Sequence, residues 1–203
     1  YLMADMTVDH EGMQICTKPL VSFAGKLYTA PMSAVDCAVK TIGTCPRHNE
    51  AFITSGMVQY NACVGNFGGS GMAYSGSMNV LKNVLGNEYL WNNVRVKGGA
   101  YGCMCGFAPS GNGYFTSYRD PNLAKTYDIY ANAADYVRSL ALDDRELTKY
   151  IIGAVGAIDL PMTASIKGNR SLAAFLAERS FEQIQKNRDE LLATTVDDLR
   201  GLS

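Results

Sequence analysis

The spacing of hydrophobic and polar residues changes along this chain, and each change predicts a different kind of element. Apolar residues recur at helical spacing in SMNVLKNVLGNEYLWNNV, residues 77–94, which predicts a helix with Gly86 as its weak point. The runs GGAYGCMCGFA and NGYFTSYRD surround the turn-rich stretch PSGNG. We therefore expect two antiparallel strands there, joined as a hairpin.

The first third of the chain predicts a less regular succession of elements. YLMADMTV, residues 1–8, is expected as a short strand, and a helix of about ten residues is expected to begin at Pro19, which suits a first helical turn. Residues 29–49 show no sustained period and are expected as a connection. EAFITSGMVQYNACVGNF, residues 50–67, predicts a strand that is bent or bulged at Gly56.

Four later helix starts are marked by side chains that can accept a hydrogen bond from the first helical turn. They are Asp120 before Pro121, Asp143 or Asp144, Ser180 with Gln183 three residues on, and Thr195 with Asp198. The helix that follows Asp120 is expected to continue as far as about Leu140.

The order of these elements is strand, helix, strands, helix, hairpin and then several helices. This order indicates an α+β fold, with an antiparallel or mixed sheet and helices packed on one face. We expect a single domain over residues 1–203. Because both ends fall inside apparent elements, the chain is also expected to be a fragment of a larger polypeptide.

Composition excludes several classes of partner. Lys and Arg total 18 against 19 Asp and Glu, and no basic run is interleaved with aromatic residues, so nucleic acid is not an expected partner. No stretch approaches the roughly 18 apolar residues of a membrane span, and the amino terminus lacks the regions of a signal peptide. A membrane is therefore not an expected partner either.

Three common enzyme motifs are also absent. The glycine-rich stretch at residues 65–76 is expected as a loop, but it contains neither a G-x-x-x-x-G-K-[ST] motif nor an intact G-x-G-x-x-G motif. Neither Ser70 nor Ser75 has glycines at both flanking positions of a G-x-S-x-G nucleophile turn. The sequence therefore favours neither a phosphate-binding loop nor a serine hydrolase.

The cysteines and histidines do not form a metal motif. The six cysteines include no C-x-x-C pair and are expected as free thiols in a reducing compartment; they are Cys16, Cys37, Cys45, Cys63, Cys103 and Cys105. His10 and His48 are the only histidines, and neither belongs to an H-x-x-E-H or H-E-x-x-H motif. This chain alone is not expected to bind a metal.

The stretch NNVRVKGGAYGC, residues 92–103, places Arg95 six residues before Tyr101, with Gly98 and Gly99 between them. Arg95 can simply cap the negative end of a helix, and Tyr101 can be a packing residue of a strand. Alternatively, the phenol can donate to an oxyanion while the guanidinium holds a substrate carbonyl or carboxylate. The glycines permit a turn and leave room for a ligand in both cases. Spacing alone favours the structural interpretation.

Several blocks of sequence together resemble a known family. They are NNVRVKGGAYG, FTSYRDPNLAKTYDIY, YIIGAVGAIDLP, KGNRSL and RDELLATTVDDL. In this order they resemble the carboxyl-terminal domain of the presequence protease and falcilysin branch of the pitrilysin (insulinase) superfamily. The resemblance is strongest from about Glu50 to Leu199, and it extends more weakly to the amino-terminal residues.

The resemblance implies a zinc endopeptidase of four α+β domains, whose two halves enclose a chamber that digests unstructured peptides. In such enzymes the amino-terminal domain holds the zinc through H-x-x-E-H. This chain would meet that half with Tyr101 as the oxyanion donor and Arg95 as the group that orients the substrate main chain. Gly98, Gly99 and Arg119 are further candidates for substrate binding, and bacterial cytoplasm or an organelle matrix is the expected location.

Two questions stay open in the sequence. Tyr101 either shares a strand face with Cys103 and Cys105 or belongs to the glycine turn, and the surrounding glycines favour the turn. The chain can also belong to a superfamily member that binds peptides or partners without catalysis. A further alternative to the peptidase is that the chain is an unrelated ligand-binding α+β domain.

Overall fold

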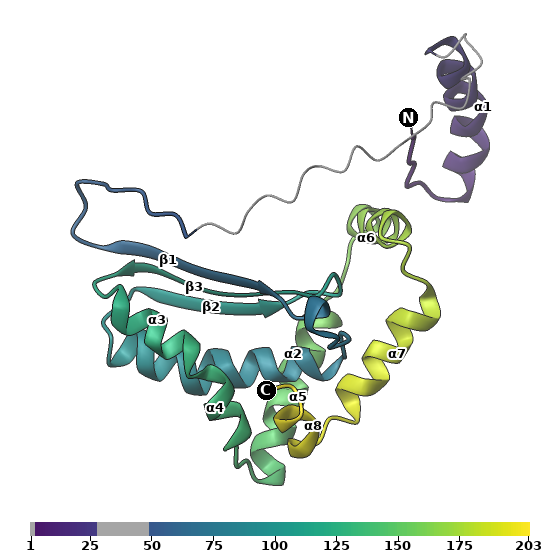
Figure 1. The fold of residues 1–203 in the computed structure, drawn as a ribbon. Coiled ribbons are helices and arrows are strands. Elements are labelled where there is room, and N and C mark those ends of the chain that lie inside the picture. Colours follow the sequence, from purple (N-terminus) through teal and green to yellow (C-terminus); the bar gives the residue numbers. More distant parts are fainter. Residues whose placement is uncertain (1–2, 28–48) are drawn as a thin grey trace. The chain divides into compact units, whose positions relative to one another are not determined.

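The computed structural model describes residues 3–27 and 49–203 (Figure 1). The described chain divides into two compact units, one formed by residues up to 54 together with 162–178, the other by residues 55–161 and 179–203. In chain order the elements are α1 (His10–Leu27), β1 (Gln59–Asn66), the short 3-10 turn η1 (Gly68–Ser70), α2 (Ser77–Val84), the π-helix η2 (Leu85–Val96), β2 (Gly102–Phe107), β3 (Asn112–Asp120), α3 (Ala124–Ala131), α4 (Ala133–Arg138), α5 (Asp144–Ile158), α6 (Ala164–Leu176), α7 (Phe181–Leu192) and α8 (Val196–Arg200).

The larger unit is built on an antiparallel sheet with strand order β1-β3-β2. Tyr118 of β3 lies opposite Tyr60 of β1 on one side and opposite Gly102 of β2 on the other. The hairpin of β2 and β3 was predicted from the sequence and is confirmed. The strand predicted over residues 50–67 is shorter than expected, because residues 49–58 lack regular structure and β1 begins only at Gln59.

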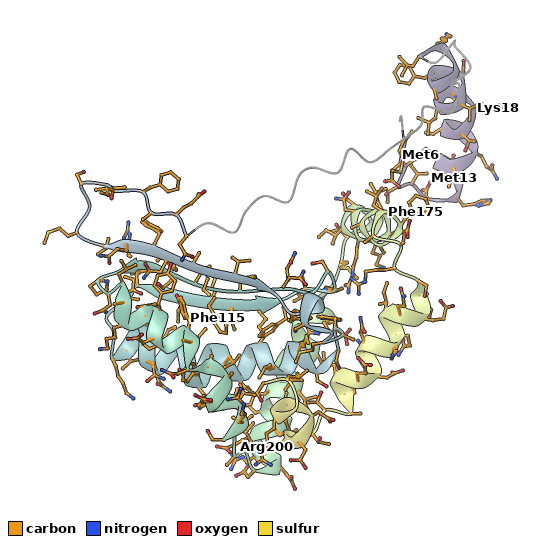
Figure 2. All side chains as sticks on the ribbon, viewed as in Figure 1. Met6, Met13, Lys18, Phe115, Phe175 and Arg200 are labelled. Atoms are coloured by element: carbon orange, nitrogen blue, oxygen red, sulfur yellow. The ribbon has the colours of Figure 1, made fainter. Side chains whose placement is uncertain are left out.

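Helices cover one face of this sheet, as the predicted α+β fold requires (Figure 1). Phe115 points from β3 toward the helices, and its ring stacks on Tyr130 of α3 with 5.5 Å between the centroids (Figure 2). The core between the layers is formed mainly by α2 and η2, whose fully buried residues include Val80, Val84, Leu90 and Val94. The predicted fold class is therefore confirmed.

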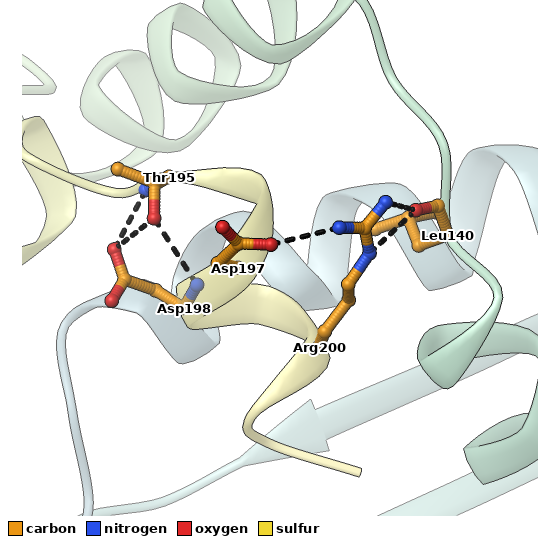
Figure 3. Close-up of polar contacts among 5 residues, drawn as sticks. All are labelled: Leu140, Thr195, Asp197, Asp198 and Arg200. Atoms are coloured by element: carbon orange, nitrogen blue, oxygen red, sulfur yellow. Dashed lines mark hydrogen bonds and ion pairs between the residues drawn. The ribbon is translucent and has the colours of Figure 1, made fainter.

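Three helix starts are capped as the sequence predicted. Capping boxes at Asp143, Ser180 and Thr195 open α5, α7 and α8. In the last of these, the amide of Asp198 donates to Thr195 Oγ1 at 3.1 Å, and the amide of Thr195 donates to Asp198 Oδ2 at 2.8 Å (Figure 3). Each box satisfies amides that the first helical turn leaves without a partner.

The short helix α8 is held against the connection between α4 and α5. Arg200 donates from Nε and Nη2 to the carbonyl oxygen of Leu140 at 2.9 and 2.7 Å, and from Nη1 to Asp197 at 2.8 Å (Figure 3). The side chain of Leu199 is fully buried. Packing and hydrogen bonds together fix this end of the described chain.

The helix expected over residues 77–94 changes its hydrogen bonding near Gly86. α2 ends at Val84, and η2 continues as a π-helix in which, for example, the amide of Lys97 bonds Asn92 O at 3.0 Å. Runs of π-helix are rare and often occur at functional sites. The sequence predicted a weak point at Gly86, but not this change of helix type.

The prediction that Asp120 caps a helix is wrong. Asp120 is the last residue of β3, and α3 begins only at Ala124. The carboxylate instead accepts hydrogen bonds that tie the strand end to its neighbours. The helix expected to reach Leu140 is also interrupted, because Asn132 separates α3 from α4 with a non-helical backbone angle.

The amino-terminal predictions fail in part. The strand expected at residues 1–8 is not seen in its described part, residues 3–8. The helix begins at His10 rather than Pro19, because the Asp9 carboxylate accepts from the amide of Gly12 at 2.7 Å and so caps the first turn. Most of the connection predicted at residues 29–49 lies outside the described residues.

The helix α6, which lies in the smaller unit, was not predicted from the sequence. The side chain of Thr163 caps it by accepting from the amide of Ile166 at 3.4 Å. Within this unit, a Cβ on Gly168 would lie 1.8 Å from Thr7 Oγ1, so the segment before α1 lies directly against α6. In the described part of the chain, none of the helices is both long and apolar enough to cross a membrane.

Candidate active site

The π-helix η2 ends in a turn that leads directly into β2. The amide of Gly99 bonds Arg95 O at 2.9 Å, and the amide of Ala100 bonds Val94 O at 3.1 Å. Both bonds span one residue more than those of the Schellman ending of an α-helix, which fits the wider hydrogen bonding of a π-helix. This ending brings Arg95 and Tyr101 to the same turn.

Two positions in the turn require glycine. A Cβ on Gly98 would lie 2.4 Å from Val94 O, so no other residue fits without a shift of the main chain. Gly99 has a φ of +82°, in the left-handed region that favours glycine. The predicted turn at Gly98 and Gly99 is therefore present, and its geometry explains both residues without any reference to a ligand.

Arg95 lies in the last turn of η2 and contacts Tyr101 directly. Its guanidinium donates from Nη1 to the main-chain oxygen of Tyr101. The guanidinium carbon lies 4.3 Å from the centroid of Trp91 and 5.6 Å from the centroid of Tyr101. Both distances are in the range of attractive cation–π contacts. Trp91 thus helps to hold Arg95, a role that was not predicted from the sequence.

Tyr101 occupies the bend just before β2, and its side chain is 57% exposed. Its ring packs edge-on against Tyr118, with 5.4 Å between the centroids. Cys105 is buried in the core beneath the sheet, and Cys103 packs partly against the same core. Tyr101 therefore does not share their face, and the turn placement favoured in the sequence is the one observed.

Arg119 lies on β3 beside the same tyrosine. Its guanidinium carbon is 5.6 Å from the Tyr101 centroid, and its main-chain oxygen accepts from the amide of Tyr101 at 3.3 Å. Its φ of +47° is unusual for a residue with a side chain. Within residues 3–27 and 49–203, no ion pair joins Arg95 or Arg119 to a carboxylate. The turn is therefore a positively charged, aromatic surface.

Asp120 is completely buried next to this surface. Its Oδ2 accepts from Ser117 Oγ at 2.6 Å, Thr126 Oγ1 at 2.8 Å and Asn61 Nδ2 at 3.2 Å, and its Oδ1 accepts from the amide of Asn122 at 2.8 Å. Burial alone would raise the pKa of this carboxyl, but the four hydrogen bonds outweigh burial and lower the pKa below its ordinary value. Asp120 is therefore a buried carboxylate rather than a neutral acid.

Asn122 connects this carboxylate network to the glycine turn. Its side-chain Nδ2 donates to Gly98 O at 2.6 Å, and its main-chain carbonyl oxygen accepts from Asn61 Nδ2 at 2.8 Å. Neither Asn122 nor Asn61 was singled out from the sequence. The only available signal was the asparagine beside Asp120 and Pro121, a combination typical of turns.

The thiols near the site are poor nucleophiles. Burial raises the pKa of Cys103, partly opposed by the nearby Arg95 guanidinium, and burial raises the pKa of Cys105 to about 12. In the described ranges, no group of three or more histidine, cysteine and acidic side chains is arranged to hold a metal ion. The chemistry available at the turn is therefore hydrogen-bond donation from a phenol and two guanidinium groups.

Comparison with known proteins identifies the family. The model of the PreP C-terminal domain matches residues 49–203. The chain is 41% identical to Protein HypA of Clostridium perfringens over 157 residues, which cover 77% of this chain and 16% of that protein. It is 36% identical to Presequence protease 1, chloroplastic/mitochondrial, of Arabidopsis thaliana over 202 residues, which cover 99% of this chain and 18% of that protein.

A third similar relative is the mitochondrial presequence protease of Emericella nidulans, 35% identical over 130 residues, which cover 64% of this chain and 12% of that protein. The fold and these relatives define a domain of a peptidase family. The chain belongs to the PreP C-terminal domain family, and it spans less than a fifth of the length of these relatives. The resemblance predicted from the sequence is confirmed, and the alternative of an unrelated ligand-binding domain is wrong.

Proposed function

We propose that the full-length protein is a zinc-dependent endopeptidase that degrades unstructured oligopeptides in a closed chamber. In this proposal the chain provides Tyr101 and Arg95 to the substrate, opposite an amino-terminal half of the same polypeptide. The observation that carries the proposal is the turn itself, in which two guanidinium groups lie 5.6 Å from the ring of an exposed tyrosine and have no carboxylate partners among the described residues. Two of the relatives are named presequence proteases, which supports the reaction class.

Tyr101 acts as the hydrogen-bond donor to the scissile carbonyl. Attack on an amide moves negative charge onto the carbonyl oxygen, and a fixed donor aimed at that oxygen lowers the barrier. The Tyr101 side chain is exposed, and the guanidinium groups of Arg95 and Arg119 add positive potential beside its ring. Both features support the phenol of Tyr101 as the proposed donor to the developing oxyanion.

Arg95 binds and orients the substrate main chain. A guanidinium has five N–H donors, and Arg95 contributes one of them to the carbonyl of Tyr101. That internal bond and the Trp91 ring restrict the side chain before substrate arrives, which reduces the entropy lost on binding. Gly98 and Gly99 are the further proposed substrate-binding residues, and they would contact the peptide through their main chain.

The metal belongs to another part of the polypeptide in this proposal. The described residues form no group that fits zinc, so the chain's own steps are binding, orientation and hydrogen-bond donation. Zinc would activate the attacking water, and closure of the two halves would exclude other solvent. Bacterial cytoplasm or an organelle matrix is the proposed location, and the chloroplast and mitochondrial names of the relatives support an organelle.

The decisive experiment is Tyr101→Phe in the full-length protein. We expect kcat for a fluorogenic peptide to fall by roughly 100-fold with little change in KM, as for loss of an oxyanion donor. Tyr114→Phe is the matched control, because Tyr114 is an exposed tyrosine of β3 that pairs with Gly106 rather than with the turn. Unchanged turnover in Tyr101→Phe would remove the phenol from the mechanism. A wild-type protein that binds peptides without cleaving them would favour the non-catalytic alternative.

A further inference from the structure

Asp120 is the only buried charged side chain in the part of the chain that the structure describes. A buried carboxylate is costly unless hydrogen bonds replace its hydration. All four of its bonds come from neutral donors, and no cation lies within ion-pair distance of it among residues 3–27 and 49–203. A buried charge without a cation partner is energetically unfavourable at the end of a strand. The position of Asp120 relative to the candidate site is therefore informative.

The donors of this carboxylate come from three different elements. Asn61 belongs to β1, Ser117 to β3 and Thr126 to α3. The amide of Asn122 supplies the fourth bond from the segment that immediately follows β3. The carboxylate therefore fixes the chain direction after β3 relative to the sheet and to the first turn of α3.

Segment 119–122 is hydrogen-bonded to the glycine turn at two points and lies close to it at a third. Arg119 O accepts from the amide of Tyr101 at 3.3 Å, and Asn122 Nδ2 donates to Gly98 O at 2.6 Å. Between them, Pro121 Cγ lies 3.5 Å from the position of a Cβ on Gly99. The left-handed backbone at Arg119 is strained, and such strain persists only when the surrounding contacts enforce it.

We propose that Asp120 is a positioning residue for the candidate active site: its carboxylate holds segment 119–122 against the glycine turn and thereby fixes the Tyr101 phenol and the Arg119 guanidinium. This inference rests on the proposed function of Tyr101. A purely structural carboxylate would stabilise the domain without any particular coupling to Tyr101. The two roles therefore predict different effects of replacing Asp120 in a variant that already lacks the Tyr101 hydroxyl.

The test is a double-mutant cycle with Asp120→Asn and Tyr101→Phe in the full-length protein. Asparagine has nearly the same shape as aspartate, but its side-chain amide would point N–H groups at hydrogen-bond donors that need an acceptor. We expect Asp120→Asn to lower kcat by roughly 10- to 100-fold, because small misplacements of a catalytic group have large effects, and to have little effect in the Tyr101→Phe background. An equal reduction in both backgrounds, or no reduction in either, overturns the proposal.

A control for general stability is Thr194→Val, which removes a buried hydroxyl from the same unit. Thr194 Oγ1 bonds Ser77 Oγ and Glu190 O, both at 2.9 Å, between α2 and α7. This variant should lower the melting temperature and leave kcat unchanged. If Asp120→Asn does not fold, Thr126→Val removes one of the four donors and should show a smaller effect with the same dependence on Tyr101. A Thr126→Val effect that is independent of Tyr101 counts against the proposal.

Hydrogen exchange separates this proposal from the proposed function. In Asp120→Asn we expect faster exchange at the amides of Gly99, Ala100 and Tyr101, with no comparable change in α7. If Tyr101→Phe itself keeps full activity, the proposed function fails, and the exchange result alone decides whether Asp120 positions the turn. Unchanged exchange at these amides overturns the positioning role.

Discussion

Asn122 donates from its side-chain amide to the main-chain oxygen of Gly98 at 2.6 Å, across 24 residues of sequence. This bond joins the segment after β3 to the turn after η2. The amide of Tyr101 also bonds Arg119 O at 3.3 Å, and Pro121 Cγ lies 3.5 Å from the position that a Cβ on Gly99 would take. The candidate site is therefore formed by the start of β2 and the end of β3. A side-chain hydrogen bond outside the β-sheet helps to hold these two strand ends together. Its geometry depends on a few polar side chains that never touch a substrate in the proposed mechanism.

Replacement of Asn122 by alanine should loosen the turn. We expect kcat/KM of the full-length protein to fall by about 10-fold, and local stability to fall by about 0.5–1.5 kcal/mol, the usual net value of one hydrogen bond. Peptide cleavage rates and exchange of the Ala100 amide are the measurements. Asn132→Ala is the control, because Asn132 Nδ2 bonds only within its own helical segment, to Asp128 O at 2.8 Å. Equal losses in both variants would contradict a specific role for Asn122.

The glycines of η2 and of the turn should respond in opposite directions to alanine. Gly98→Ala places a methyl group 2.4 Å from Val94 O and should destabilise by about 1–3 kcal/mol. Gly99→Ala forces a side chain into the left-handed region and should cost about 1–2 kcal/mol. A methyl group on Gly86 would meet open space, so Gly86→Ala should stabilise the helix by about 0.5–1 kcal/mol.

Local opening of residues 85–107, measured by hydrogen exchange, distinguishes these three variants. Activity should fall in Gly98→Ala and Gly99→Ala and should be retained in Gly86→Ala. A stable and fully active Gly98→Ala variant would show that the main chain can adjust, and it would weaken the link between the turn and catalysis.

Asp120 should make the larger unit sensitive to acid. Its folded-state pKa is lowered, so ionised Asp120 stabilises the fold above its unfolded pKa of about 3.9, and this stabilisation is lost as the pH falls through the folded value. Asp120→Asn should therefore be less stable than wild type near pH 7, and the difference should shrink as the pH falls below about 4. Melting temperatures between pH 7 and pH 2 test this, and a constant difference would contradict it.

Alkylation should distinguish the exposed thiol from the buried one. Cys63 is exposed on β1, whereas Cys105 is buried and has a pKa of about 12. At pH 8 only roughly one Cys105 side chain in ten thousand is a thiolate, so iodoacetamide should modify Cys63 in the native protein and Cys105 only after unfolding. Peptide mapping by mass spectrometry gives both rates. Comparable native rates would mean that the sheet opens far more readily than its packing indicates.

The sequence predicted features whose partners lie close together in the chain. The capping boxes at Ser180 and Thr195 each join residues three apart, and the hairpin of β2 and β3 is formed around one turn-rich stretch. The hydrogen bond that caps the start of α1 is equally local, because it joins Asp9 to Gly12. This cap could have been predicted from the sequence. Local hydrogen-bond chemistry explains why such features are accessible without a structure.

The surroundings of the candidate site depend on distant partners and were not predictable in this way. Asp120 looked like a helix cap because Pro121 follows it, but the carboxylate is captured by Asn61, which lies 59 residues away in the sequence. The π-helical hydrogen bonding of η2 was not predicted either, because tertiary context can override local helix propensity. Arg95 and Tyr101 were singled out as functional residues through the family resemblance, because spacing alone favoured a structural role, whereas the parts played by Trp91 and Asn122 became visible only in three dimensions.

The bond from the Arg95 guanidinium to the carbonyl of Tyr101 has a consequence for protein engineering. The arginine is attached to the backbone of the same residue whose phenol is proposed to act, so neither group can be relocated while the other is kept. To transplant this pair into another scaffold, a designer would have to transfer the end of η2, the glycine turn and the end of β3 as one block. The unit to transfer is therefore a pair of hydrogen-bonded chain segments rather than two side chains.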